Sequence, residues 1–222
     1  WIRILYAYPE RITDEFIAAM QRNEKVVRYL DLPIQHCNTR ILKAMNRRGD
    51  EEVVKSAIRR LRAAMPDITL RTTLIAGYPG ETEAEFEQLC EFVKDTRFER
   101  LGCFAFSPEE GTPAARMEGQ LPEEEKQRRA GVIMDLQARI SAQLLEKKVG
   151  SVQTVICDGV DEESGLYLCR SAADAPEIDG NICVASDTPL YPGEFYRVKI
   201  DESGMYDLFG YVVEENEDES AQ

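Results

Sequence analysis

Two patterns of apolar residues alternate along the first two thirds of the chain. Short β-rich runs are separated by segments whose apolar residues recur at helical spacing. The predicted strands are residues 2–8, 28–34, 69–76 and 100–107. A strand-helix-strand order is typical of βα units, which join parallel strands by right-handed crossovers. The pattern therefore predicts an α/β domain built on a parallel sheet.

Polar residues that cap helices mark where these helices begin. The predicted N-caps are Thr13, Asn38 or Thr39, Asp50 and Thr82. Thr82 is followed three residues later by Glu85, which predicts a capping box. Residues 122–148 predict one long helix that closes the domain. Four strands are too few for an eight-stranded barrel, and the first would leave an open edge. We therefore expect a parallel sheet that is not a closed barrel, in a chain that is part of a longer protein.

The last third of the chain differs in pattern and in charge. Five short β runs are predicted at residues 152–158, 166–170, 182–186, 195–200 and 205–213. Residues 1–149 hold 24 Lys+Arg and 24 Asp+Glu, whereas residues 150–222 hold 3 and 17. The whole net charge of −14 thus belongs to the last third. We predict a domain boundary near Gly150, a second domain of β-strands over 150–215, and a disordered acidic tail over 216–222.

Composition also excludes several classes of protein. No stretch without a charged residue is longer than nine residues, the length of Thr72 to Gly80, which is far short of a membrane span. Six cysteines lie 53, 13, 54, 12 and 14 residues apart, so none pairs into a local metal clamp. They are interpreted as reduced thiols of a cytoplasmic protein, although disulfides stay possible.

Candidate functional residues lie where the predicted strands end, because loops and helix N-termini converge there. The loop from Gly77 to Glu81 contains a second glycine at Gly80, which suits a bound ligand or an ordinary turn. His36, the only histidine, follows Gln35 and is open to an acid/base, ligand-orienting or structural role.

The third predicted strand adds two polar candidates. Arg71 and Thr73 share one face of it under strand alternation. A buried Arg71 would need an anion or a neighbouring carboxylate, unless that face lies outside.

Four segments at these strand ends resemble radical S-adenosylmethionine methylthiotransferases in order and spacing. They are residues 29–36 (YLDLPIQH), 41–47 (ILKAMNR), 71–83 (RTTLIAGYPGETE) and 106–113 (FSPEEGTP). Gln35-His36, Arg71-Thr72-Thr73 and residues 170–180 (RSAADAPEIDG) resemble the RimO-like branch, which acts on a ribosomal protein, more than the MiaB-like branch, which acts on tRNA.

The resemblance implies a radical-SAM partial (β/α) barrel, with four of six strands present, followed by a small β-barrel, the OB-like TRAM domain. It implies transfer of a methylthio group to the β-carbon of an aspartate in a small-subunit ribosomal protein. The cofactors would be S-adenosylmethionine, which yields a 5′-deoxyadenosyl radical, and two 4Fe-4S clusters. The implied cofactor-binding residues are Gln35, His36, Arg71, Thr73, Gly77 and Phe106. No catalytic residue is assigned.

The sequence departs from this family in one respect. It lacks the CxxxCxxC motif, so we expect no bound cluster, no metal ligand and no activity from this chain alone. The acidic last third favours a basic ribosomal protein as partner and disfavours tRNA, because nucleic-acid binders neutralise phosphates with Lys and Arg. The alternatives are a MiaB-like tRNA adenosine methylthiotransferase and a non-catalytic protein-binding scaffold.

Overall fold

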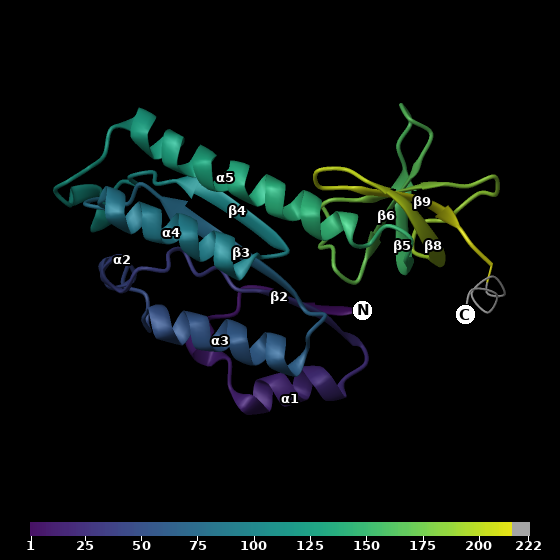
Figure 1. Cartoon of the computed structure of the whole chain (residues 1–222), viewed down its shortest axis with the longest axis horizontal. Helices are drawn as coiled ribbons and strands as arrows, with labels where there is room; N and C mark the ends of the chain where they lie inside the picture. Colours follow the sequence, from purple (N-terminus) through teal and green to yellow (C-terminus); the bar gives the residue numbers. More distant parts are fainter. Residues whose placement is uncertain (215–222) are drawn as a thin grey trace. The chain divides into compact units, whose positions relative to one another are not determined.

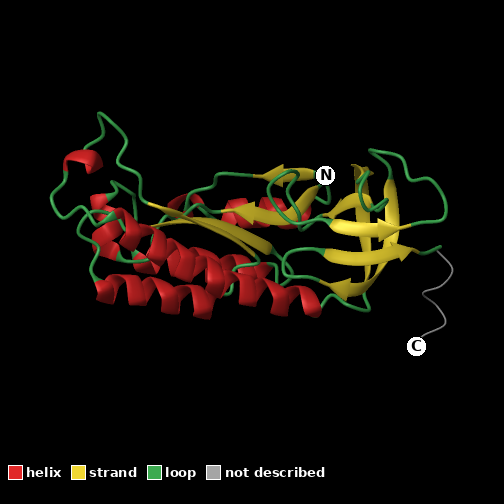
Figure 2. Ribbon diagram, turned by 90° about the horizontal axis from the view of Figure 1, so that it is seen from above, coloured by secondary structure: helices red, strands yellow, loops and turns green. Residues whose placement is uncertain are grey.

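Four parallel strands form the sheet of the first part of the chain, in the order β1-β2-β3-β4. The structure, a computed structural model, describes residues 1–214. The elements are β1 (Ile2–Ile4), η1 (Pro9–Arg11), α1 (Asp14–Arg22), β2 (Val26–Asp31), α2 (Thr39–Ala44), α3 (Glu51–Ala64), β3 (Thr69–Ala76), α4 (Glu83–Thr96), β4 (Arg100–Ala105), η2 (Ala114–Arg116) and α5 (Glu123–Glu146). The helices gather on one face of the sheet (Figures 1 and 2). The predicted parallel α/β architecture is confirmed.

The predicted caps place the helices correctly. Thr13 Oγ1 accepts a hydrogen bond from Phe16 N at 3.1 Å, Asn38 caps α2 and Asp50 caps α3. Thr82 and Glu85 form the capping box at the start of α4. Each cap joins residues that are close in sequence, so the pattern alone identifies it.

The first strand is shorter than predicted. It ends at Ile4, whereas the apolar run extends to Tyr8. Tyr6 adopts a left-handed backbone conformation (φ 61°), and Pro9 begins the η1 turn. The backbone therefore leaves the sheet before the apolar run ends, and the prediction of a strand over residues 2–8 was wrong beyond Ile4.

The second part is a closed five-stranded barrel with the order β5-β6-β7-β9-β8. Its strands are β5 (Val152–Val160), β6 (Tyr167–Ser171), β7 (Ile182–Ala185), β8 (Phe195–Ser203) and β9 (Leu208–Val212). Inward residues alternate along the strands and form one apolar core, which includes Val155, Val184 and Val198. The predicted small β-barrel is confirmed, except that Met205 and Tyr206 lie in a turn before β9 rather than in the strand.

The chain divides into two compact units, the first from Trp1 to Ile140 and the second beginning at Ser141. All six cysteines are free thiols. Within residues 1–214, no helix combines the length and apolar character that a membrane span requires. The acidic tail predicted over residues 216–222 lies outside the described residues.

Candidate functional site

The sheet face that the helices leave uncovered carries two of the predicted residues. Along β3, Thr72 and Leu74 are buried, whereas Arg71, Thr73 and Ile75 are partly exposed. Strand alternation therefore directs the last three to the face opposite the helices. Their partners across β4 are Arg100, Gly102 and Phe104, and the Phe104 side chain is largely exposed. An amphipathic surface of cations and apolar groups results.

Arg71 has a carboxylate partner on this face. Its Nη1 lies 3.1 Å from Oδ1 of Asp31, the residue beside it in the β2–β3 register. The Asp31 side chain is almost fully buried, and its Oδ2 also accepts a longer bond from Tyr6 N at 3.4 Å. Asp31 is thus the neighbouring carboxylate that Arg71 was expected to need.

Gln35 extends the parallel pairing beyond the end of β2. Its backbone N donates to Thr73 O at 2.9 Å, and its O accepts from Ile75 N at 2.8 Å. The residue has a positive φ of 70°, a conformation that costs a non-glycine residue about 1–2 kcal/mol. The pairing places Gln35 opposite Leu74, towards the carboxyl end of β3.

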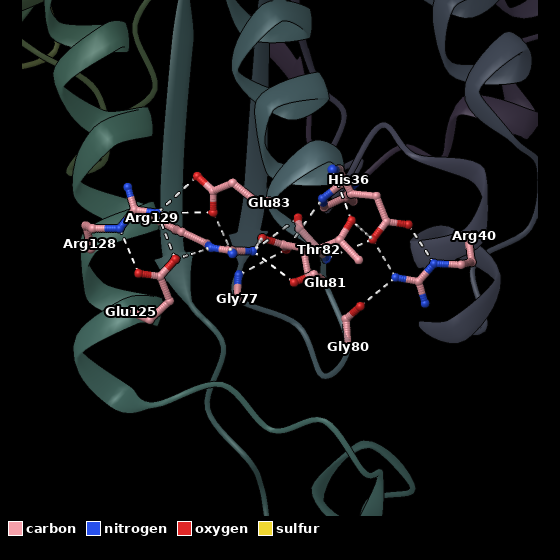
Figure 3. A network of polar contacts seen from close by, with 11 residues as sticks. His36, Arg40, Gly77, Gly80, Glu81, Thr82, Glu83, Glu125, Arg128 and Arg129 are labelled. Atoms are coloured by element: carbon pink, nitrogen blue, oxygen red, sulfur yellow. Dashed lines mark hydrogen bonds and ion pairs between the residues drawn. The ribbon is translucent and has the colours of Figure 1, made fainter.

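His36, in contrast, is fully buried and lies in a network of polar contacts (Figure 3). Its Nδ1 accepts a hydrogen bond from Asn38 N at 2.9 Å. The proton of a neutral imidazole is then on Nε2, which faces Glu81 Oε2 at 3.5 Å, a long contact for a hydrogen bond. Both nitrogens of His36 are therefore directed at the protein itself.

Glu81 is the centre of this network. Its fully buried carboxylate accepts from Gly77 N at 3.0 Å and from Arg129 Nη1 at 2.7 Å. Burial on its own would raise the pKa of Glu81, but hydrogen bonds from His36 and Arg129 outweigh it and keep the pKa below the ordinary value. Glu81 thus ties the loop after β3 to α5 as an ionised group.

Arg129 distributes its positive charge over three carboxylates. Besides Glu81, it contacts Glu125 Oε1 at 2.6 Å and Glu83 Oε2 at 2.9 Å, and it donates to the Glu81 carbonyl at 3.0 Å. Its guanidinium also lies 5.1 Å from the Phe86 ring centroid. Arg129 thus joins the first turns of α4 and α5 to the loop after β3.

The other end of the loop is held by Arg40. Its Nη2 donates to Gly80 O at 2.7 Å and contacts Glu85 Oε2 at 2.5 Å, while its Nε donates to Glu85 Oε1 at 2.6 Å. This pairing with Arg40 is the main reason why the pKa of Glu85 falls to about 2. The loop from Gly77 to Glu81 is therefore fixed from both sides.

The substitution Glu85→Gln tests this charge through pH. Folding lowers the pKa of Glu85 from 4.5 to about 2, so its stabilisation is complete above pH 4.5 and is lost as the pH falls towards 2. The difference in unfolding free energy between the wild type and the variant should shrink over that interval in urea titrations. Glu87→Gln, at an exposed position of α4, is the matched control. A difference that does not change with pH would contradict the role of the Arg40 pair.

Phe106 and Tyr78 provide apolar packing for the loop from Gly77 to Glu81. Their rings meet edge to face at 5.2 Å within an apolar cluster that also contains Ile41. Lys126 Nζ donates to the Phe106 carbonyl at 3.0 Å. Phe106 is thus mostly buried and supports the loop from beneath.

The structure therefore separates the predicted residues into two layers. Arg71 and Thr73 are partly exposed at the open face, and Gln35 is partly exposed beyond the end of β2. His36, Gly77 and Phe106 are buried in the layer that fixes the loop. Sequence reasoning missed Arg40, Lys126 and Arg129. The only local signal for Arg129 is its i,i+4 spacing from Glu125, which ordinary surface pairs share.

The open face can hold an amphipathic ligand that carries a carboxylate, but it offers nothing to a metal cluster. A cation at Arg71 and apolar groups at Ile75 and Phe104 suit a ligand that has both a carboxylate and a flat ring. Among residues 1–214, no group of three His, Cys, Asp or Glu side chains is placed to bind a metal ion. The residues present thus fit S-adenosylmethionine and do not fit an iron–sulfur cluster.

Comparison with known proteins gives a consistent result. Residues 2–93 match the radical SAM superfamily and residues 149–213 match the TRAM domain. The ribosomal protein uS12 methylthiotransferase RimO of Desulfitobacterium hafniense strain Y51 is 47% identical over 214 residues, which are 96% of this chain and 48% of that protein. The protein of the same name from Acetivibrio thermocellus is 45% identical over 97% of this chain and 48% of its own length. The chain spans about half the length of the curated relatives that it matches.

One solved structure supports the fold. Coproporphyrinogen III oxidase (HemN) from Escherichia coli, described as a radical SAM enzyme, aligns with a TM-score of 0.50 at 19% identity. The alignment covers 72% of this chain and 34% of that chain.

Proposed function

We propose that this chain, which combines a radical SAM domain with a TRAM domain, is the carboxyl-terminal half of a RimO-type methylthiotransferase. It is similar to such enzymes over 96% of its length. The complete enzyme would add a methylthio group to the β-carbon of an aspartate in ribosomal protein uS12. The identity across both domains carries this proposal.

We assign S-adenosylmethionine binding to the open face of the sheet. Bound S-adenosylmethionine and a reduced cluster supply the radical chemistry that breaks an unactivated C–H bond. In this chain, Arg71 would attract the carboxylate of the ligand while Asp31 holds the guanidinium in place. Thr73 and Gln35 would contact its polar groups. His36, Gly77 and Phe106 would act from behind, by fixing the loop that borders the ligand.

Replacing Arg71 with alanine in the complete enzyme should raise the dissociation constant for S-adenosylmethionine about tenfold or more. A hydrogen bond to a charged group contributes roughly 1.5–3 kcal/mol, which the variant loses. Equilibrium dialysis measures the constant. Arg28→Ala, on β2 but paired with Asp67 at 2.5 Å, is the control. An unchanged constant in Arg71→Ala would remove this role.

The iron–sulfur clusters would be held by the half of the enzyme outside this chain. The six cysteines are widely spaced, and four of them are buried. We therefore propose that this chain alone does not carry out the transfer. Six free thiols also support our assignment of the protein to the reducing cytoplasm.

We further propose that the acidic barrel region of the second unit, residues 150–214, docks the protein substrate. Residues 150–214 contain three Lys+Arg and thirteen Asp+Glu. One of the three cations, Arg170, is paired with Asp158 at 2.9 Å. Such a surface attracts a basic protein and repels phosphates.

Mass spectrometry of uS12 and of tRNA, after each is incubated with the complete reconstituted enzyme, tests the proposed activity. A mass gain of one methylthio group is expected on uS12. Modification of tRNA instead would favour the MiaB-like alternative, and modification of neither would favour the scaffold.

A further inference from the structure

Two loops of the second unit are pressed together, backbone against backbone. One is the β6–β7 loop (residues 172–181) and the other is the β8–β9 turn (residues 204–207). Asn181 N donates to Asp207 Oδ1 at 2.7 Å, and Leu208 N donates to Asn181 O at 3.0 Å. A Cβ added to Gly180 would lie 2.0 Å from the Tyr206 carbonyl oxygen. Only glycine allows this approach, so the two loops are in close contact at Gly180.

The β6–β7 loop is also ordered by its own polar groups. Asp174 is buried, and its Oδ2 accepts from Ser171 N at 3.0 Å and from Ser171 Oγ at 2.6 Å. Asp179 Oδ2 accepts from Ala175 N at 2.8 Å. Side chains at the outer end of such a loop are presented to a partner with little further loss of conformational entropy.

Large apolar side chains on these two loops face solvent. Ile178 is 51% exposed, Met205 58% and Tyr206 39%. The core cluster of the barrel includes none of the three. We call Ile178, Met205 and Tyr206 the loop patch. Exposed apolar groups on two loops that contact each other are typical of an interaction surface.

The charge around the loop patch defines its partner. Residues 171–181 and 201–208 contain six Asp+Glu and no Lys or Arg, and Glu177, Asp201 and Glu202 are exposed. Arg197 and Lys199 lie on β8 before Asp201 and Glu202, and Lys199 pairs with Tyr211 of β9. The exposed apolar residues of the loops therefore have an acidic border, whereas the exposed Tyr211 has a cation beside it.

We propose that the loop patch is the docking site for a lysine- and arginine-rich segment of the protein substrate. This inference rests on the proposed function, since it assumes a basic protein substrate. Apolar side chains of the segment, and the aliphatic stems of its Lys and Arg residues, would pack on Ile178, Met205 and Tyr206. Their charged ends would reach Glu177, Asp201 and Glu202. The loop within residues 170–180, whose sequence resembles the RimO-like branch, thereby acquires a role in substrate choice.

The test measures binding of purified uS12 to the whole chain by fluorescence anisotropy at two salt concentrations. The triple variant Ile178→Ala/Met205→Ala/Tyr206→Ala should bind at least about tenfold more weakly, as expected when the anchors of an interface are truncated. Tyr211→Ala is the matched control, because Tyr211 is 46% exposed on the same barrel. This substitution should change the dissociation constant for uS12 by less than about twofold. Glu177→Lys is a single substitution at an exposed position, and it should weaken the binding of uS12 most at low salt.

The outcomes distinguish a failure of the loop patch as docking site from a failure of the proposed function. If the wild-type chain binds uS12 and both the triple variant and Glu177→Lys bind equally well, the loop patch is not the docking site, while the proposed function stands. An equal loss in Tyr211→Ala would also overturn the patch, because the whole barrel would then be the binding surface. If the wild-type chain does not bind uS12, the proposal that the second unit docks the protein substrate is itself wrong.

Discussion

Replacing Arg129 with methionine is expected to lower the free energy of unfolding of the first unit by about 3–5 kcal/mol, the cost of removing one partner from a buried ion pair. The Glu81 carboxylate would stay buried without its 2.7 Å contact to the guanidinium. Only Gly77 N and the long contact to His36 would then face it. Methionine fills most of the space of the arginine stem, so the loss reports charge rather than a cavity.

The neighbouring residue provides the control. Arg128 is 47% exposed and contacts Glu125 and Glu83, two of the carboxylates that Arg129 also contacts. Exposed pairs contribute roughly 0–1 kcal/mol, so Arg128→Met should have little effect. Urea unfolding followed by the helical circular dichroism signal compares the two variants, because the helices lie in the first part of the chain. Equal losses would show that the buried network does not hold the loop.

Features that depend on residues close together in the sequence were the ones predicted best. The capping box of Thr82 and Glu85 joins residues three apart, and strand β3 matches the predicted residues 69–76. Both depend on local sequence. The end of β1 depends on a left-handed turn at Tyr6, a residue that rarely adopts one, so the apolar run beyond Ile4 gave a wrong strand end.

The buried network could not be predicted because it joins distant residues. Arg129 lies 48 residues from Glu81, and in the sequence it is one of two adjacent arginines in a charged helix. Only the packing of α5 against the loop shows that Arg129 is buried and Arg128 is not. The position of His36 after a predicted strand made it a candidate. Whether it contacts a ligand or supports the loop depends on its burial, and burial is determined by the fold.

Gly77 shows how closely that packing fits. Its φ is +78°, a conformation that costs a residue with a Cβ about 1–2 kcal/mol. An added Cβ would also lie 2.5 Å from Lys126 Cγ and 3.0 Å from Lys126 Cα. Lys126 has little freedom to move, since its buried Nζ donates to the Phe106 carbonyl at 3.0 Å. Relief would therefore require α5 to shift away from the loop.

Gly77→Ala should accordingly destabilise the first unit by about 3 kcal/mol, the sum of backbone strain and roughly 1–3 kcal/mol of overpacking. Gly111→Ala isolates the first contribution, because Gly111 has a φ of +82° and nothing within 4 Å of an added Cβ. The two variants differ in the collision alone, and urea unfolding of both measures its cost. Equal destabilisation would mean that Lys126 yields without cost and that the loop is held by its hydrogen bonds rather than by contact with α5. A larger loss in Gly77→Ala would instead establish that the loop has only one packed position, which is the property that a fixed ligand border requires.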